Sequence, residues 1–387
     1  MKLMHLGDLH LGKALGEFDL IEDQRFILNQ ILSLIDQRGV DAVLIAGDVY
    51  DRAVPSEAAT RLLDTFLSAL AARRVKVFLI SGNHDSDQRL NYGSALFEKN
   101  QVYIASVCDG HLVSHTIREE DTGTEVTISL LPFVKASRVR HFFPDAQIET
   151  YEDAVRVILE NSPVDTGKRN ILVAHQFVAG RGADPELSGS EGAGAQYVGT
   201  VEKIGYDLFD AFDYVALGHI HSPQKVGREE VRYSGSPLKY SLSEVNNEKS
   251  VPLITILGDE PVQIELAALK PLRGMRHLKG TMKELLDPAN VKDTNDFIYA
   301  TFTDEDIIDD AMGIFQNTYP YTVKIDYDNR YTKTMEQTDI TSIVSSRSFS
   351  DLIRDYYRLV FGCEISEEEM DVMKMAAREA GVIDEAG

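Results

Sequence analysis

Short apolar runs and longer stretches of helical periodicity alternate through the first hundred residues. Apolar runs lie within residues 2–11, 40–51 and 75–85, and apolar side chains recur every three or four positions over 20–38 and after Pro55. Strands separated by helices predict βαβ units and an at least partly parallel sheet. The continuous apolar character of the runs is typical of strands covered on both faces.

Beyond residue 100 the pattern changes to shorter strands of more antiparallel character. A helix is predicted near 150–161, and two further continuous apolar strands end at His175 and near His221. Residues 179–199 are rich in glycine and are predicted to form a long loop. The fold class expected for the first part of the chain is therefore α/β, with added antiparallel strands.

Three domains are predicted. The first spans 1–272, and a small α+β domain follows over 273–335, with a helix at Glu305–Gln316 between two strands. The third segment, 336–387, shows two amphipathic helices over 348–381. The second of these helices begins at a capping-box pattern, Ser366–Glu369.

Composition narrows the class of protein. The chain has 387 residues, 43% hydrophobic and 26% charged, which is typical of a folded globular protein. Its two cysteines form no CxxC pair, and the N-terminus resembles no signal peptide, so we expect a reducing, cytoplasmic location. No apolar run approaches the roughly 18 residues of a membrane span. The net charge of −23 weakens, without excluding, a nucleic-acid partner.

Five apolar strands end in polar clusters. In an open α/β sheet the carboxyl ends of strands line the ligand crevice, so these side chains are expected to converge. The clusters are, in chain order, Asp8 and His10; Asp48 and Asp51; Asn83, His84 and Asp85; His175; and His219 with His221.

Such a set of side chains predicts a metal centre. Asp, Asn and His are mixed oxygen and nitrogen ligands, suited to manganese, iron or zinc. Seven candidate ligands exceed what one ion needs, so two ions bridged by Asp48 are expected, a site suited to phosphoryl chemistry. In each D-x-H or H-x-H pair, an extended backbone would place both side chains on one face. Taken alone, His175 is more often a core residue and GNHD a turn, but the ordered series favours the metal site.

The ordered motifs GDLH, GDVYDR, GNHD, a single His and GHIH resemble those of the calcineurin-like metallophosphoesterases. The resemblance covers residues 1 to about 270 and implies a two-layer β-sandwich flanked by helices. MKLMHLGDLHLGK, GDVYDRAVPS and RYSGSPLKYS further resemble the SbcD family, the nuclease subunits of bacterial SbcCD complexes. By this resemblance, Asp8, His10, Asp48 and His221 would hold one ion, and Asp48, Asn83, His175 and His219 the other. The expected ion is Mn²⁺. His84 would be the catalytic residue that stabilises or protonates the leaving oxygen.

Asp51 departs from part of the family pattern. The archaeal and eukaryotic relatives carry His there, and GDVYDR instead resembles the GDxxDR of protein phosphatases. In the phosphatases the second Asp of this motif hydrogen-bonds the catalytic His. The resemblance therefore implies that the Asp51 carboxylate orients His84 and raises its basicity. Asp85 is expected to be a supporting or turn residue.

The resemblance also implies partners. The small domain would cap the active site, and the C-terminal helices would dock on the coiled-coil ATPase SbcC. Apolar side chains there, including Phe349, Tyr356, Tyr357 and Phe361, favour docking, although a hairpin folded on its own domain is an alternative. A homodimer, formed through helices near 56–100 within a heterotetramer, is also implied.

The function expected is a dimetal DNA nuclease, a double-strand exonuclease and single-strand or hairpin endonuclease, acting in recombination and repair at the nucleoid. A small-substrate phosphodiesterase or protein phosphatase is the alternative, and the C-terminal third favours the nuclease. The intact ligand set argues against a non-catalytic scaffold. Candidate phosphate contacts are Arg89, Lys135, Arg138, Arg140, Arg181 and Lys225.

Overall fold

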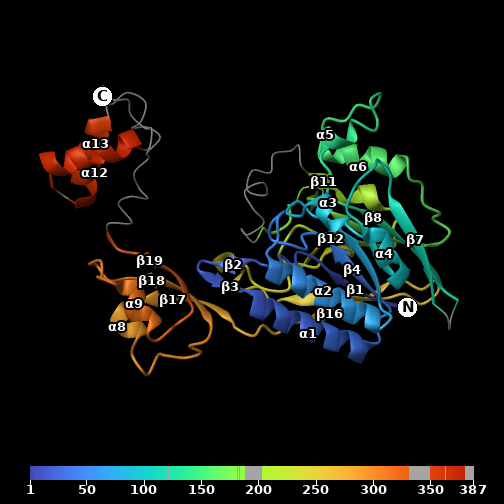
Figure 1. Ribbon diagram of the computed structural model, residues 1–387, viewed down its shortest axis with the longest axis horizontal. Helices are drawn as coiled ribbons and strands as arrows, with labels where there is room; N and C mark the ends of the chain where they lie inside the picture. Colours follow the sequence, from blue (N-terminus) through green and yellow to red (C-terminus); the bar gives the residue numbers. More distant parts are fainter. Residues whose placement is uncertain are drawn as a thin grey trace. The chain divides into compact units, whose positions relative to one another are not determined.

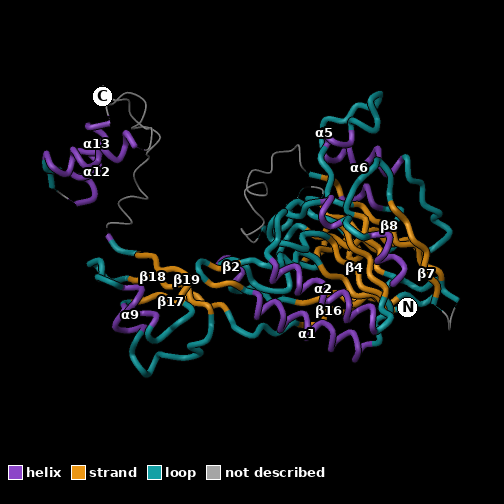
Figure 2. Tube along the Cα trace, viewed as in Figure 1, coloured by secondary structure: helices purple, strands orange, loops and turns teal. Residues whose placement is uncertain are grey.

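The computed structural model describes residues 1–119, 123–180, 182, 184–187, 203–330, 349–361 and 363–379. It divides into two compact units, residues 1–276 and 277–387 (Figures 1 and 2). Arg181, most of the predicted 179–199 loop and residues 336–348 therefore lie outside the described part. Among the described residues, no helix is both long and apolar enough to cross a membrane.

The first unit is built on two six-stranded sheets. The first sheet has the order β16 (Gln263–Ala268), β15 (Ser250–Thr255), β1 (Lys2–Leu6), β4 (Ala42–Ala46), β5 (Lys76–Ile80) and β6 (Val102–Ala105). The second has the order β13 (Gln224–Val226), β14 (Arg228–Tyr233), β12 (Tyr214–Gly218), β9 (Arg169–His175), β8 (Glu125–Leu131) and β7 (Val113–Arg118).

Both sheets are mixed. Strands β1, β4, β5 and β6 run parallel, as do β8, β9, β12 and β14, while β15, β16, β7 and β13 pair antiparallel. One apolar cluster contains buried side chains of both sheets, among them Leu44 and Phe78 of the first and Ile128 and Val173 of the second. The sheets therefore pack face to face, and the predicted two-layer sandwich is confirmed.

Helices cover the outer faces (Figure 1). α1 (Ile21–Arg38) and α2 (Glu57–Ala72) contact each other, and α2 contacts β5. α2 begins at Ser56, whose side chain accepts a hydrogen bond from the Ala59 amide, and α1 ends at Gly39 in the left-handed conformation. The shorter elements are α3 (Asp87–Leu90), α4 (Ser94–Phe97), α5 (Ala136–Val139), α6 (Tyr151–Glu160), the hairpin β2 (Ala14–Leu15) with β3 (Phe18–Asp19), and β10 (Val178–Ala179) with β11 (Ile204–Gly205). Single 3₁₀ turns are η1 (Glu98–Asn100), η2 (Tyr206–Phe209) and η3 (Leu242–Glu244).

The second unit contains a three-stranded sheet, β17 (Met275–Gly280), β18 (Phe297–Phe302) and β19 (Thr322–Tyr327), with α8 (Met282–Leu285) and α9 (Ala311–Gln316). The helix predicted from Glu305 begins six residues later, because Asp310 adopts a left-handed conformation that interrupts the helix. Two more helices, α12 (Phe349–Phe361) and α13 (Glu367–Glu379), confirm the predicted pair. The capping box is also confirmed, since Ser366 and Glu369 exchange backbone-to-side-chain hydrogen bonds.

Candidate metal centre

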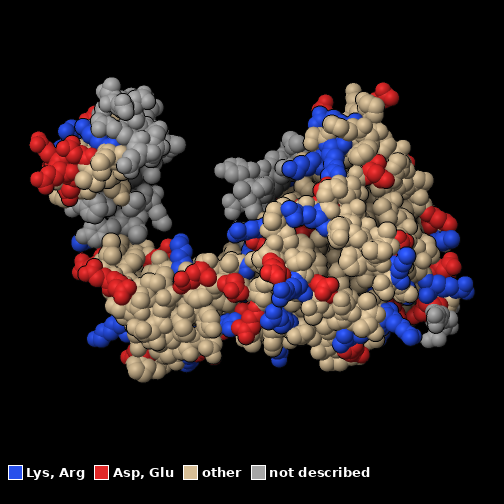
Figure 3. Space-filling model, in the orientation of Figure 1, with Lys and Arg blue, Asp and Glu red and all other residues tan. Residues whose placement is uncertain are grey.

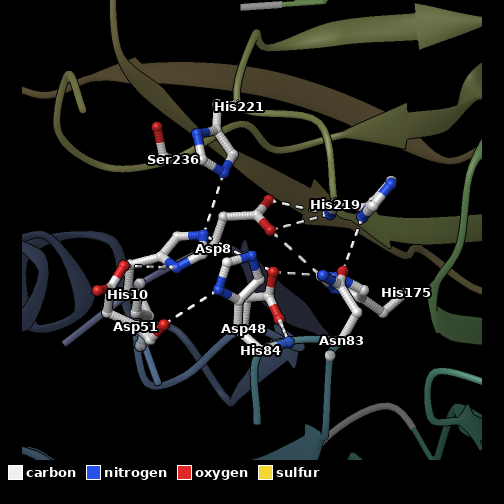
Figure 4. A network of polar contacts seen from close by, with 12 residues as sticks. Asp8, His10, Asp48, Asp51, Asn83, His84, His175, His219, His221 and Ser236 are labelled. Carbon is white, nitrogen blue, oxygen red and sulfur yellow. Dashed lines mark hydrogen bonds and ion pairs between the residues drawn. The ribbon is translucent and has the colours of Figure 1, made fainter. Parts of the chain in front are cut away.

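The predicted ligands converge where the carboxyl ends of β1, β4, β5, β9 and β12 meet (Figure 4). The structure brings together three ligand groups, in each of which all ligand atoms lie within 4.8 Å of one another. These groups are Asp8, His10 and His221; Asp8, Asp48 and His175; and His10, Asp48 and His84. The two predicted ligands outside these groups are Asn83 and His219. Oδ1 of Asn83 lies 2.9 Å from Nδ1 of His219 and 3.0 Å from Nε2 of His175.

The backbone that carries these side chains is not extended, contrary to the sequence prediction. β1 ends at Leu6 and β12 at Gly218, before the ligands begin. Asp8, His10, Asp48 and His219 all have positive φ angles, of 52°, 43°, 47° and 106°. Such a conformation is strained for a residue with a Cβ and is found mainly where function requires it. The D-x-H and H-x-H pairs therefore share the site through turns and not through strand periodicity.

Two loops hold this strained backbone in place. The Asp8 amide donates to the Gly47 carbonyl at 3.1 Å, and the His10 amide donates to the Asp48 carbonyl at 2.9 Å. On the other side, the Asp85 carboxylate accepts from the amides of Val49, Tyr50 and Gly82, at 3.0, 2.9 and 2.9 Å. Asp85 thus joins the loop after β4 to the loop after β5, which makes it a supporting residue as expected.

Glycines make room for the ligands themselves. A Cβ on Gly47, whose φ is +80°, would lie 2.4 Å from Nδ1 of His175, and one on Gly218 would lie 1.9 Å from the Ala46 carbonyl oxygen. That carbonyl accepts a hydrogen bond from Nδ1 of His175 at 2.8 Å. The close contact between the two sheets at this point therefore depends on glycine.

The hydrogen bond from Nδ1 of His175 to the Ala46 carbonyl bears on whether these residues can bind a cation. With the proton of a neutral imidazole on Nδ1, Nε2 presents a lone pair to Oδ1 of Asn83 and to Oδ2 of Asp48, at 3.0 and 3.4 Å. A positive charge must therefore lie between these atoms: either a proton on Nε2, consistent with the raised pKa of His175, or a divalent ion in its place. The donor set therefore fits a divalent ion, with a neighbouring hydrogen bond fixing the histidine tautomer.

Electrostatics inside the site reflect burial among acids and imidazoles. Burial raises the pKa of Asp8 to about 6 and lowers that of His219 to about 3. Burial also opposes charge on Asp48 and His175, but their attraction outweighs it, holding the pKa of Asp48 well below its ordinary value and raising that of His175 to about 9. Asp48 thus provides a fixed negative charge at the centre of the site.

The expectation for the Asp51 side chain is wrong. Nδ1 of His84 faces the backbone carbonyl oxygen of Asp51, at 3.0 Å, and not its carboxylate. The carboxylate accepts from Nζ of Lys13 at 2.8 Å and lies 3.6 Å from Nδ1 of His10. Asp51 still orients His84, but the loop fold turns its side chain toward the neighbouring GDLHLGK loop.

Residues outside the predicted set also support the centre. Gln24 of α1 donates to the His10 carbonyl at 2.7 Å and accepts from the Gly12 amide at 2.9 Å. Tyr240 donates from its hydroxyl to the Leu9 carbonyl at 2.6 Å. Sequence reasoning missed both. Gln24 lies in no motif, and Tyr240, although it belongs to the RYSGSPLKYS segment, acts on backbone far away in the sequence.

Comparison with known proteins identifies the family to which the chain belongs. A family model described as "Calcineurin-like phosphoesterase" matches residues 1–223, more than half of the chain and all of the residues of the centre. The chain belongs to the calcineurin-like phosphoesterase family. The predicted fold class and metal-dependent phosphoesterase class are thereby confirmed.

Two further likenesses extend beyond this domain. A second family model, described as "Type 5 capsule protein repressor C-terminal domain", matches residues 271–361. The curated SbcD subunit of the nuclease SbcCD from Staphylococcus epidermidis (strain ATCC 12228 / FDA PCI 1200) is 32% identical over 381 residues, covering 97% of each chain. The resemblance to the SbcD family is confirmed, and with it the prediction of a nuclease-subunit homologue. A solved dimetal phosphatase from Danio rerio is 11% identical, covers 70% of this chain and 98% of that chain, and superposes with a TM-score of 0.37.

Proposed function

We propose that this phosphoesterase is a DNA nuclease that cleaves duplex ends exonucleolytically and single strands or hairpins endonucleolytically, together with a coiled-coil ATPase of the SbcC type. The observation that carries the proposal is that all seven candidate ligands converge on one site. The chain that forms this site is similar to an SbcCD nuclease subunit over nearly its full length. We expect the nuclease to act in DNA recombination and repair, in the cytoplasm at the nucleoid.

Two divalent ions, with Mn²⁺ as the expected metal, would activate water and neutralise charge on the scissile phosphate. Asp8, His10, Asp48 and His221 are proposed to hold the first ion, in agreement with the Asp8, His10 and His221 group. Asp48, Asn83, His175 and His219 are proposed to hold the second, in agreement with the two Asn83 contacts.

His84 is proposed to act on the leaving oxygen. The His84 amide donates to Oδ1 of Asp48 at 2.9 Å, and its ring packs edge-on against His10 with ring centroids 4.8 Å apart. Because Nδ1 is occupied by the Asp51 carbonyl, Nε2 is the atom left to meet the substrate. In the imidazolium form of His84, which carries a second proton on Nε2, that proton would stabilise or protonate the departing alkoxide and leave the neutral ring with its proton on Nδ1.

A basic surface beside the centre supports a polyanionic substrate. Figure 3 shows Lys and Arg side chains gathered over the part of the surface where α3 and α5 lie. Among the candidates there, Arg138 pairs with Asp87, whereas Arg89, Lys135 and Arg140 are exposed and form no ion pair within the described part of the chain. Lys135 follows closely on Phe133, whose ring packs against His175 with ring centroids 6.2 Å apart. Lys225 pairs with Glu229 and is the weaker candidate.

Two surfaces support the proposed partners. On α12 and α13, Tyr356, Val372 and Met375 are at least 40% exposed, which suits docking on SbcC; the side chain of Phe361 lies outside the described part. Around α2 to α4 a cavity of about 470 Å³ is lined mainly by apolar side chains, among them the largely exposed Tyr92, and Leu96 of α4 is also exposed. This second surface supports a homodimer. The proposed domains remain 1–272, the capping domain 273–335 and the SbcC-binding segment 336–387.

The experiment that tests the proposal measures nucleotide release from linear double-stranded DNA with Mn²⁺, for the wild type and for His84→Ala. We expect release by the wild type and its loss in the variant, with His111→Ala, an exposed histidine, as the matched control. If the wild type, with or without the ATPase, releases nothing but hydrolyses a small phosphodiester in a His84-dependent way, the alternative of a small-substrate phosphodiesterase or protein phosphatase is correct.

A further inference from the structure

A buried ion pair lies behind the metal-centre residue His221. Glu244 has no exposed surface and Lys249 is 5% exposed, although both come from the irregular segment between β14 and β15. Oε2 of Glu244 accepts a hydrogen bond from Nζ of Lys249 at 2.5 Å. Replacing a buried ion pair by apolar residues is often neutral or stabilising, so stability alone does not account for this one.

The pair contacts both ends of His221. Nζ of Lys249 donates to the His221 carbonyl at 2.9 Å and to Oγ of Ser236 at 2.8 Å, and the Ser236 amide donates to the same carbonyl at 3.1 Å. Oε1 of Glu244 faces Nδ1 of His221 at 3.7 Å and accepts from the Tyr240 amide at 3.1 Å. The backbone and the ring of His221 are therefore held by one network.

The charge on Glu244 is maintained by its neighbours. Nζ of Lys249 and the Tyr240 amide both donate to the Glu244 carboxylate, which supplies the partners that a buried negative charge needs. Lys249 balances this charge and occupies Oε2, which leaves Oε1 directed at the imidazole. A carboxylate behind a histidine holds the proton on the near nitrogen and leaves a lone pair on the far one.

We propose that Glu244, together with Lys249, is a positioning residue that fixes His221 with its proton on Nδ1 and its Nε2 lone pair aimed at the first ion. In the structure that Nε2 lies 3.1 Å from Nε2 of His10, which is proposed to bind the same ion. The inference rests on the proposed function. It adds a physical reason for the affinity of the first ion position for its metal.

The test is Mn²⁺ binding to the full chain, measured by calorimetric titration without substrate. Glu244→Gln removes the carboxylate but leaves the Lys249 charge buried, which can unfold the protein. The double variant Glu244→Gln/Lys249→Met therefore removes both charges and is compared by the melting temperature of the apoprotein. Glu229→Gln, an exposed glutamate of β14, is the matched control.

We expect the double variant to melt near the wild type while binding one of two ions about 10- to 100-fold more weakly, with the other ion unaffected. Wild-type affinity for both ions, or equal weakening of both, would overturn the positioning role while leaving the proposed dimetal function standing. A wild type that binds fewer than two ions would instead overturn the dimetal proposal and this inference with it.

Discussion

Nδ1 of His84 lies 3.0 Å from the backbone carbonyl oxygen of Asp51, and this bond orients the ring proposed to perform the chemistry. An uncharged carbonyl can fix which ring nitrogen of His84 carries the proton without placing a carboxylate charge against the imidazole. The Asp51 carboxylate is instead 2.8 Å from Nζ of Lys13 and 3.6 Å from Nδ1 of His10. The roles of the two residues should therefore separate in mutants.

His84→Ala is expected to lower kcat by about 10²- to 10⁴-fold, the range for loss of a general acid. Asp51→Asn keeps the carbonyl, so kcat at saturating Mn²⁺ should stay within about tenfold of wild type, while Mn²⁺ affinity weakens because a residue packed against His10 has changed. Steady-state kinetics across a Mn²⁺ series measure both effects. A kcat loss in Asp51→Asn equal to that in His84→Ala would show that the carboxylate acts on His84 after all.

Metal binding should stabilise the fold. Binding to the native state alone adds about 2.7 kcal/mol to the free energy of unfolding at a concentration one hundred times Kd. We expect Mn²⁺ to raise the melting temperature, EDTA to reverse the rise, and Asp48→Asn to remove most of it, because Asp48 belongs to two of the ligand groups. Asp36→Asn, which changes a surface pair with Arg73, should retain the full effect. An undiminished shift in Asp48→Asn would exclude Asp48 as a shared ligand.

The capping box of α6 predicts a pH dependence of stability. Hydrogen bonds from Thr150 lower the pKa of Asp153 from its ordinary 3.8 to about 2. The unfolded state therefore binds the proton more tightly, so the contribution is present above pH 4 and is lost as the pH falls through about 2. Asp153→Asn, which removes the charge that these hydrogen bonds hold, should lower the free energy of unfolding by about 1 kcal/mol at pH 7, measured by urea denaturation. The difference from wild type should shrink in acid; a constant difference would contradict the assignment.

Reversing charge beside the centre should affect DNA and not small substrates. The double variant Lys135→Glu/Arg140→Glu is expected to weaken duplex binding and to reduce the slope of log K against log salt by about 1 for each phosphate interaction that the substitutions remove. Hydrolysis of a small phosphodiester should be unchanged. Lys168→Glu is the control, because Lys168 immediately precedes the amino end of β9, at the end of the strand away from the ligands. Equal loss in the control would show only a general charge effect.

Much of the centre can be predicted from the sequence because the ends of buried strands are visible in it. An apolar run such as AVLIA of β4 is buried throughout, and the polar residues after it must lie at the edge of the sheet. The order of the motifs then identified the chemistry. Periodicity does not fix the element boundaries: α9 begins at Ala311 and not near Glu305, because the left-handed conformation of Asp310 is a local detail that periodicity does not reveal.

The sequence by itself determined the alternation of strands and helices and the identity of the converging side chains, since apolar patterning is a local property of the chain. The order of the motifs identified the family, and the two-layer fold was implied by that resemblance. Only the tertiary structure decided how those side chains are held. The carbonyl that meets His84, the left-handed turns at Asp8 and Asp48, and the Glu244–Lys249 pair behind His221 all depend on contacts between loops of different strands. Hydrogen-bond geometry of that kind is set by how the two sheets pack, and no linear pattern encodes it.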